Sequence, residues 1–172
     1  MLDPEYVLGL VDGEGCFSVR LNKSQRRRAK VELKFSLKLR HQDKNVLDEL
    51  KSFFRCGAVY IQRDRRKNHS TCYRFEVQKR KDIQEVIVPF FERNHLHTPS
   101  KQRDFGLFKQ VLQHLQEDGD LQKIEQLKNQ MHWGLAAYGK TVRAVGTPSS
   151  KNQETANKAM PVKPPEQVFD EA

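Results

Sequence analysis

Two acidic residues, Asp12 and Glu14, end an apolar segment that contains two glycines, and this arrangement could support hydrolysis of a phosphodiester. Gly9 and Gly13 stand four positions apart, so on a helix they share one face, where a second copy of the helix could approach closely. Two copies packed in this way would each place a carboxylate at the end of the contact. Carboxylates hold Mg²⁺ in proteins, and a bound metal activates water and stabilises the leaving oxygen of a phosphodiester. The pattern of residues 7–15 appears once in the sequence, so two chains would be needed to form one site. The simpler alternative is that the glycines only end a short core helix.

Basic charge is concentrated in one segment of the chain. The 172 residues carry a net charge of +9 at pH 7. Residues 16–81 contain 20 Lys and Arg against 6 Asp and Glu, whereas residues 82–139 contain 6 against 8. This distribution indicates a polyanionic partner, and the alternative is a well-solvated surface.

The cysteines and the hydropathy indicate an intracellular protein without a membrane partner. Cys16, Cys56 and Cys72 are odd in number and lack the spacing of a zinc site, which argues for a reducing compartment. No apolar run approaches the ~20 residues that cross a bilayer. The N-terminus shows no secretory signal pattern.

Capping residues and apolar periodicity predict five helices and four strands. Asp3 is the expected cap of the first helix, with Pro4 in its first turn, and Gly13 and Gly15 are expected to end it. Pro89 predicts a kink or an early stop in the third helix. In chain order we expect a helix at 3–12, strands at 17–22 and 30–40, a helix at 43–54, strands at 59–62 and 73–78, and helices at 82–94, 99–116 and 120–131.

This order predicts an α+β fold in which helices cover one face of an antiparallel four-stranded sheet. In the second hairpin we expect Val59 and Ile61 to point inward, with the polar residues outward. The other sheet face would then be polar and basic, and a two-stranded ribbon of this kind fits the major groove of DNA. Residues 1–139 are expected to form one domain, and residues 140–172, which lack periodicity, a flexible or extended tail.

Residues 7–15, VLGLVDGEG, resemble position by position the motif of the LAGLIDADG homing endonucleases. Residues 53–60 look like the turn into the third strand of that family, and residues 96–108 like the segment that carries a lysine near the cleavage site, here Lys101. The resemblance covers about residues 4–132. It implies the αββαββα fold of the family, with a saddle-shaped antiparallel four-stranded sheet and extra C-terminal helices.

The resemblance also implies roles for the motif residues. Glu14 would be the catalytic acid and metal ligand, helped by the carbonyl of Gly13, although the family more often has Asp at position 14. Mg²⁺ is the expected metal, with Mn²⁺ or Ca²⁺ able to replace it for binding. Gly9, Asp12 and Gly13 would lie at the dimer interface, with Asp12 as a cap or acceptor at the end of the facing helix. Lys101 is the second catalytic candidate, and the alternative is a solvated lysine near a helix start.

The outward residues of the predicted hairpins are the candidate DNA contacts. The expected contacts to base edges are Ser18, Arg20, Asn22, Lys30, Glu32, Lys34, Ser36, Tyr60, Gln62 and Arg74. Two further basic residues of the second strand, Lys38 and Arg40, belong to the same face. The expected contacts to phosphates or outer bases lie in the two hairpin loops: Lys23, Gln25, Arg26, Arg27, Arg28, Arg65, Arg66 and Lys67.

Taken together, the residues and the resemblance imply a homodimeric, metal-dependent endonuclease that cuts both strands of a long pseudo-palindromic DNA target. Its gene would then lie in a mobile intron, and the protein would work in a bacterial cytoplasm or an organelle. Two alternatives use the same scaffold: an RNA-binding intron maturase, and a DNA-binding protein that does not cut. The acid at position 14 favours a nuclease. One departure is Leu39, where several relatives have a glutamine; Lys38 and Gln42 lie nearby.

Overall fold

The structure is a computed structural model and describes residues 2–22, 30–62, 70–117 and 119–132. The predicted tail, residues 140–172, lies outside this part of the chain. The strands are β1 (Gly15–Leu21), β2 (Val31–Arg40), β3 (Ala58–Gln62) and β4 (Cys72–Val77). The helices are α1 (Pro4–Glu14), a short 3-10 helix η1 (His41–Asp43), α2 (Lys44–Phe54), α3 (Arg80–Asp82), the π-helical turn η2 (Ile83–Ile87), α4 (Val88–Arg93), α5 (Pro99–Glu117) and α6 (Leu121–Gln130).

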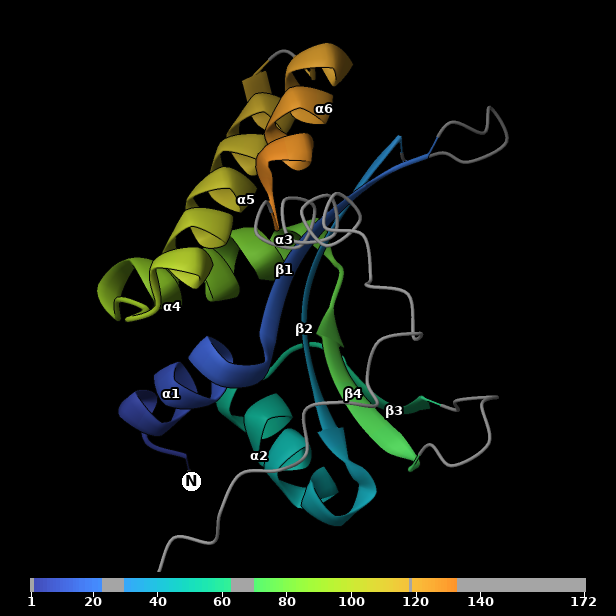
Figure 1. Cartoon of the computed structure of the whole chain (residues 1–172), viewed down its shortest axis with the longest axis vertical. Helices are drawn as coiled ribbons and strands as arrows, with labels where there is room; N and C mark the ends of the chain where they lie inside the picture. Colours follow the sequence, from blue (N-terminus) through green and yellow to red (C-terminus); the bar gives the residue numbers. More distant parts are fainter. Residues whose placement is uncertain (1, 23–29, 63–69, 118, 133–172) are drawn as a thin grey trace, which may run out of the picture. The chain divides into compact units, whose positions relative to one another are not determined.

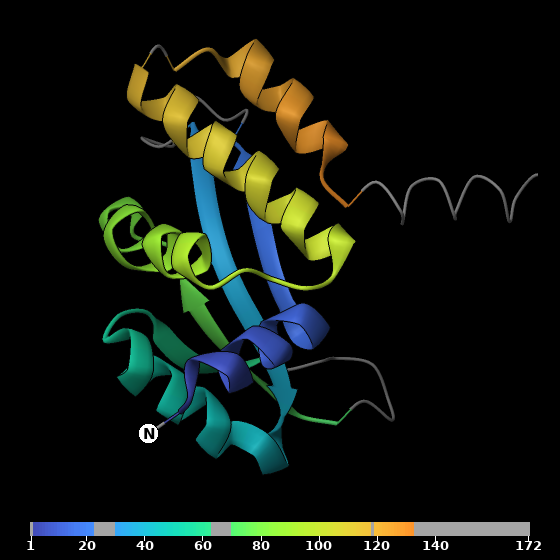
Figure 2. The same ribbon diagram turned by 90° about the vertical axis from the view of Figure 1, so that its left-hand side faces the viewer.

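The sheet is antiparallel throughout, with the strand order β1-β2-β4-β3. The helices lie on one of its faces, as Figures 1 and 2 show from two directions. Alternate residues of the strands, among them Phe17, Phe35 and Phe75, are fully buried under the helices. The α+β prediction is therefore confirmed.

Helix α1 joins strand β1 without a loop. The carboxylate of Asp3 accepts a hydrogen bond from the backbone N–H of Glu5 at 2.8 Å, which confirms the predicted cap. The helix runs to Glu14, two residues further than predicted, because the N–H of Gly15 donates to the carbonyl of Val11 and closes the last turn. A Cβ atom on Gly15 would lie 2.5 Å from a side-chain carbon of Val11, so only glycine fits at this junction.

A cluster of phenylalanine rings joins the helices to the sheet. Phe17 of β1 lies 5.1 Å from Phe35 of β2, between ring centroids, and 5.3 Å from Phe91 of α4, which it meets edge-on. Phe105 and Phe108 of α5 pack against the same Phe17 ring at 5.3 and 5.5 Å. Such aromatic contacts fix the orientation of α5, and with it the lysine at its start, relative to β1.

Two local features differ from the prediction. Residues 80–93 are helical, but a π-helical turn, η2, precedes Pro89; this wider turn accommodates a residue that cannot donate to the carbonyl of Glu85. Ile61, predicted to point inward, is 43% exposed, because β3 is an edge strand that pairs only with β4. Within the described residues, none of the helices combines the length and apolar character of a membrane crossing.

Candidate active site and nucleic-acid interface

One side of α1 is left uncovered by the described chain. Val7, Leu8 and Val11 are buried against the core, whereas Gly9 and Gly13 are exposed. A Cβ atom added to either glycine would meet nothing within 4 Å, so no described part of the chain packs there. Because neither glycine has a side chain, a second helix could approach the backbone of α1 closely on this side.

Glu14 is exposed at the point where α1 becomes β1, and Gly13 beside it is exposed as well. Among the described residues there is no group of three or more His, Cys, Asp and Glu that could hold a metal. One chain thus offers one carboxylate and one neighbouring carbonyl. Both are oxygen donors of the kind Mg²⁺ takes, and a second copy would supply the missing half of the set.

The second catalytic candidate contacts the backbone next to the first, although Lys101 follows Gly15 by 86 positions in the sequence. Lys101, in the first turn of α5, donates a hydrogen bond from Nζ to the carbonyl oxygen of Gly15, the residue after Glu14. The structure thus brings a cation next to the end of the motif. Periodicity alone could not show this contact, because it depends on how α5 crosses β1.

Asp12 accepts hydrogen bonds within its own chain. Its carboxylate accepts from the backbone N–H of His97 at 2.8 Å and of Thr98 at 3.1 Å, and from the Thr98 hydroxyl at 2.6 Å. The carboxylate thus ties α1 to the residues that lead into α5, which begins at Pro99. The predicted role of Asp12 at the contact with a second copy stays a prediction.

The hydrogen bonds to Asp12 also set its ionisation. Burial alone would raise the pKa of Asp12, but the bonds from Thr98 and His97 outweigh it and the pKa is lowered. A lowered pKa means that the charged carboxylate stabilises the folded state above the ordinary aspartate range. That stabilisation disappears as the pH falls through the lowered pKa.

Asp12→Asn is therefore expected to lower the free energy of unfolding at pH 7 by about 1–2 kcal/mol, since a neutral amide accepts these bonds more weakly. Urea unfolding at several pH values measures the effect. The gap between the two proteins should shrink as the pH falls below the ordinary aspartate range. A gap of constant size would show that the charge of Asp12 does not matter.

The face of the sheet opposite the helices carries the predicted base-contacting residues. Across β1 and β2, Arg20 stands opposite Glu32 and Ser18 opposite Lys34. The described candidates on this face are Ser18, Arg20, Asn22, Lys30, Glu32, Lys34, Lys38, Arg40, Tyr60, Gln62 and Arg74. The loop candidates Lys23, Gln25, Arg26, Arg27, Arg28, Arg65, Arg66 and Lys67 lie outside the described residues.

Ser36 does not fit the prediction that it contacts a base. It is 4% exposed and stands between Cys16 and Glu76, its neighbours on the adjoining strands. A residue covered in this way cannot present its hydroxyl to a groove. Alternation predicted the face of the sheet on which Ser36 lies. It could not predict that Ser36 is buried there, because this burial depends on side chains of the neighbouring strands.

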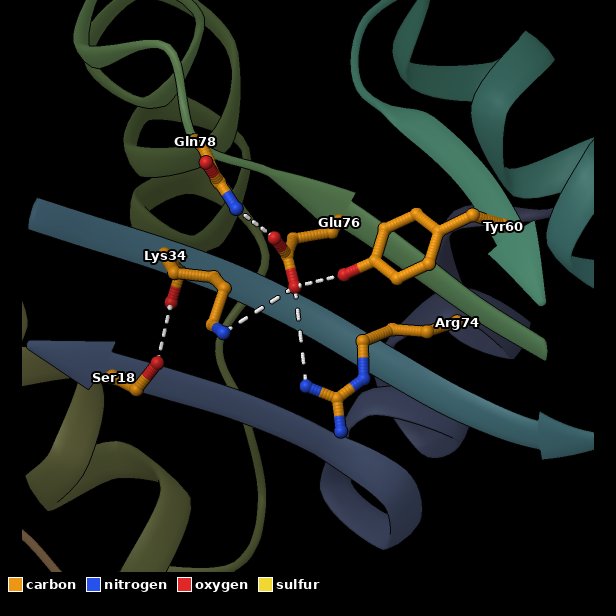
Figure 3. A network of polar contacts seen from close by, with 6 residues as sticks. All are labelled: Ser18, Lys34, Tyr60, Arg74, Glu76 and Gln78. Atoms are coloured by element: carbon orange, nitrogen blue, oxygen red, sulfur yellow. Dashed lines mark hydrogen bonds and ion pairs between the residues drawn. The ribbon is translucent and has the colours of Figure 1, made fainter. Parts of the chain in front are cut away.

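Glu76, which no motif singles out in the sequence, is the centre of a polar network on the same face (Figure 3). Its carboxylate accepts hydrogen bonds from the Tyr60 hydroxyl and the Gln78 amide, and lies 3.3 Å from Nζ of Lys34 and 3.9 Å from a guanidinium nitrogen of Arg74. The carboxylate comes from β4, and its partners come from β2, β3, β4 and the residue that follows β4. The signal in the sequence that could have indicated this role is an acidic residue at an outward strand position among basic residues.

The family model described as LAGLIDADG endonuclease matches residues 7–112. The chain belongs to this family. The match includes the whole motif of α1, all four strands and the lysine of α5.

Individual relatives agree with this assignment. A Mycosarcoma maydis protein named "Probable intron-encoded DNA endonuclease 1" is 33% identical over 100 residues, which cover 58% of this chain and 34% of that protein. The homing endonuclease I-TnaI is 32% identical in its crystal structure, with a TM-score of 0.63 over 84% of this chain and 99% of that chain. I-SmaMI bound to uncleaved DNA with calcium is 30% identical, with a TM-score of 0.65 over 87% of this chain and 51% of that one.

The curated relatives are longer than this chain, which spans between 24% and 34% of their lengths. Among the solved LAGLIDADG structures, this chain spans nearly all of I-TnaI but only about half of I-SmaMI. The family model and these structures together show the family and the fold of this chain.

Proposed function

We propose that this chain is a site-specific DNA endonuclease in which two copies of the fold make one active site. The observation that carries the proposal is the exposed Glu14 at the end of an uncovered helix face, next to Lys101 and beside a polar sheet face. Packing two α1 helices along their glycine sides would bring the two Glu14 carboxylates together. That the fold spans about half of DNA-bound I-SmaMI supports a two-copy arrangement.

The residues at the motif suit a divalent metal. Glu14 and the carbonyl of Gly13 from each copy would hold Mg²⁺, which activates water and stabilises the leaving oxygen when bound; Mn²⁺ or Ca²⁺ would replace it for binding. Lys101 would keep a positive charge beside this position and stabilise negative charge that develops on the phosphate. Asp12 holds the start of α5 so that Lys101 stays in reach of the motif.

Target recognition is assigned to the polar sheet face. Side chains such as Arg20, Lys34 and Arg74 would read base edges in the major groove, and the basic hairpin loops would contact phosphates. Two copies related by a two-fold axis would read a long pseudo-palindromic site. Binding should weaken steeply with salt, with a log–log slope of about −0.9 for each phosphate neutralised.

Intron RNA is the second candidate partner, because the relatives carry names that place their genes in introns. A maturase would use the same basic face but would not need a carboxylate at each end of the α1 contact. If the protein is such a nuclease, its gene would lie in a mobile intron. The protein would then cut DNA in the compartment that holds that intron. The exposed Glu14 favours the nuclease over both the maturase and a DNA-binding protein that does not cut.

Lys101→Met is expected to slow cutting by about ten- to a hundredfold, since supporting groups around a metal site commonly have effects of this size. Lys109→Met is the matched control: it removes the same charge from α5, where Lys109 pairs with Glu92 at 3.0 Å. Single-turnover cleavage rates at saturating protein measure both. Equal rates for the Lys101 variant and the unmodified protein would assign Lys101 a structural role only.

A further inference from the structure

We infer that Glu76 is a positioning residue for DNA recognition, which holds Lys34 and Arg74 in fixed orientations so that these two cations discriminate between base pairs. The inference rests on the proposed function, because it assumes that the polar sheet face binds DNA. It concerns a residue whose side chain would not itself contact DNA.

Burial separates the anchor from the groups that it holds. The side chain of Glu76 is 5% exposed, whereas those of Lys34 and Arg74 are 33% and 26% exposed. The carboxylate therefore lies beneath the cations, and a ligand on the sheet would meet the ammonium and guanidinium groups first. One negative charge faces two positive charges, so the cluster keeps a net positive charge for a polyanion.

The carboxylate has little capacity left for a base edge. One oxygen accepts from the Gln78 amide, and the other accepts from the Tyr60 hydroxyl and faces both Lys34 and Arg74 (Figure 3). A carboxylate that read cytosine or adenine would need a free oxygen directed at the groove. The contacts of Glu76 thus fit a role in orienting Lys34 and Arg74, and they do not fit a direct hydrogen bond from Glu76 to a base.

Glu76 remains charged at the pH where the protein would work. Burial alone would raise the pKa of Glu76, but the hydrogen bonds from Tyr60 and Gln78 and the charge of Lys34 outweigh it and lower the pKa. Burial, followed by the hydrogen bond to Glu76 and its charge, raises the pKa of Tyr60 to about 12. Both directions agree with the network that the geometry shows.

The position of the cluster selects which base pairs it would read. Cys16, Ser36, Glu76 and Ala58 form one row across all four strands. Cys16 follows Glu14 by two residues, so this row lies next to the proposed active site. In a two-fold assembly the row would face the inner base pairs of each half-site, whereas the Asn22 end of β1 would face the outer ones.

Two buried polar atoms without a partner in the described chain support a ligand on this face. Nε of Arg74 is buried and has no hydrogen-bond partner among the described residues, and the same holds for Oε1 of Gln62 on the neighbouring edge strand. Unpaired buried polar atoms cost free energy, so they are rare unless a partner can arrive.

Glu76→Gln tests the inference, because the amide keeps the shape of the side chain and loses its charge. The freed cations would bind phosphates of any sequence. We therefore expect tighter binding to random DNA, with a log–log salt slope steeper by about 0.9–1.8, one to two phosphate contacts. Discrimination against substitutions at the inner base pairs of each half-site should fall about tenfold, with outer base pairs unaffected.

Asp48→Asn is the matched control for net charge, since Asp48 pairs with Lys44 on α2, away from the polar sheet face. This variant should bind random DNA with the affinity and the salt dependence of the unmodified protein. It should also discriminate equally well against substitutions at the inner base pairs of each half-site. Tyrosine ionisation supplies a readout without DNA: Tyr60 should begin to ionise at a lower pH in Glu76→Gln than in the unmodified protein, with Tyr60→Phe identifying the signal.

The inference is contradicted if folded Glu76→Gln keeps the inner discrimination and the salt slope of the unmodified protein. If Glu76→Gln does not fold, Glu76→Asp replaces it, because its shorter side chain keeps the charge but does not reach as far. Discrimination at the inner base pairs should then be partly lost. Full discrimination by this variant would overturn the inference. Unmodified protein that binds no DNA in a sequence-dependent way overturns the proposed function as well, and that failure is seen without any variant.

Discussion

Glu14→Gln is expected to bind its DNA target with nearly unchanged affinity and to cut it at least about a hundredfold more slowly. The amide keeps the size of the side chain, and the sheet face that would bind DNA is untouched. A direct metal ligand should matter more than the outer-shell partners of metal sites, whose loss commonly costs ten- to a hundredfold. Binding measured with Ca²⁺ and single-turnover cutting measured with Mg²⁺ separate the two effects.

Glu5→Gln is the matched control for this variant. Glu5 is an exposed acid in the first turn of the same helix, and its backbone N–H, which Asp3 caps, is unaffected by the change. It should cut at the rate of the unmodified protein. Cutting by Glu14→Gln at that rate would remove Glu14 from the active site and with it the proposed metal position.

Gly9→Leu is expected to abolish the pairing of two copies and therefore the cutting. In the single chain a Cβ atom at Gly9 meets nothing within 4 Å, so the fold should tolerate leucine, which also favours a helix over glycine by roughly 0.8 kcal/mol. Between two closely packed α1 helices, the same side chain would force the backbones apart. Sedimentation should find a folded monomer for Gly9→Leu and a dimer for the unmodified protein.

Gly106→Leu controls for the change of residue type. Gly106 lies in α5 and also has no atom within 4 Å of an added Cβ. It should leave both the dimer and the cutting rate as they are. A Gly9→Leu protein that remains dimeric and active would place the two-fold contact on another part of the surface.

The sequence contained most of the fold because the fold is built from local patterns. Strict alternation over β1 and β2 predicted which residues face the core, and Phe17 and Phe35 are indeed fully buried. Asp3 and Pro4 predicted the start of α1, where the cap is present. Ile61 lies on the predicted face, the one that carries the buried Phe75, but it is 43% exposed, because alternation does not reveal whether a helix covers a given stretch of an edge strand.

The site was predictable in its residue types but not in its contacts. The motif and the resemblance gave Glu14 and Lys101 as candidates, but only the crossing of α5 over β1 puts the lysine on the carbonyl of Gly15. Asp12 accepts from residues 85 and 86 positions away, which no spacing in the chain encodes. Glu76 shows the same limit, since its importance comes from the register that aligns it with side chains of other strands.

The measurement that tests the central proposal most directly is selection of cleaved molecules from a randomised DNA library, with Mg²⁺ and with EDTA, beside Glu14→Gln. We expect enrichment of one long pseudo-palindromic sequence, cut on both strands, in the sample with Mg²⁺ and unmodified protein only. Absence of cutting under every condition, together with tight binding to structured intron RNA, would contradict it and assign the basic sheet face to RNA.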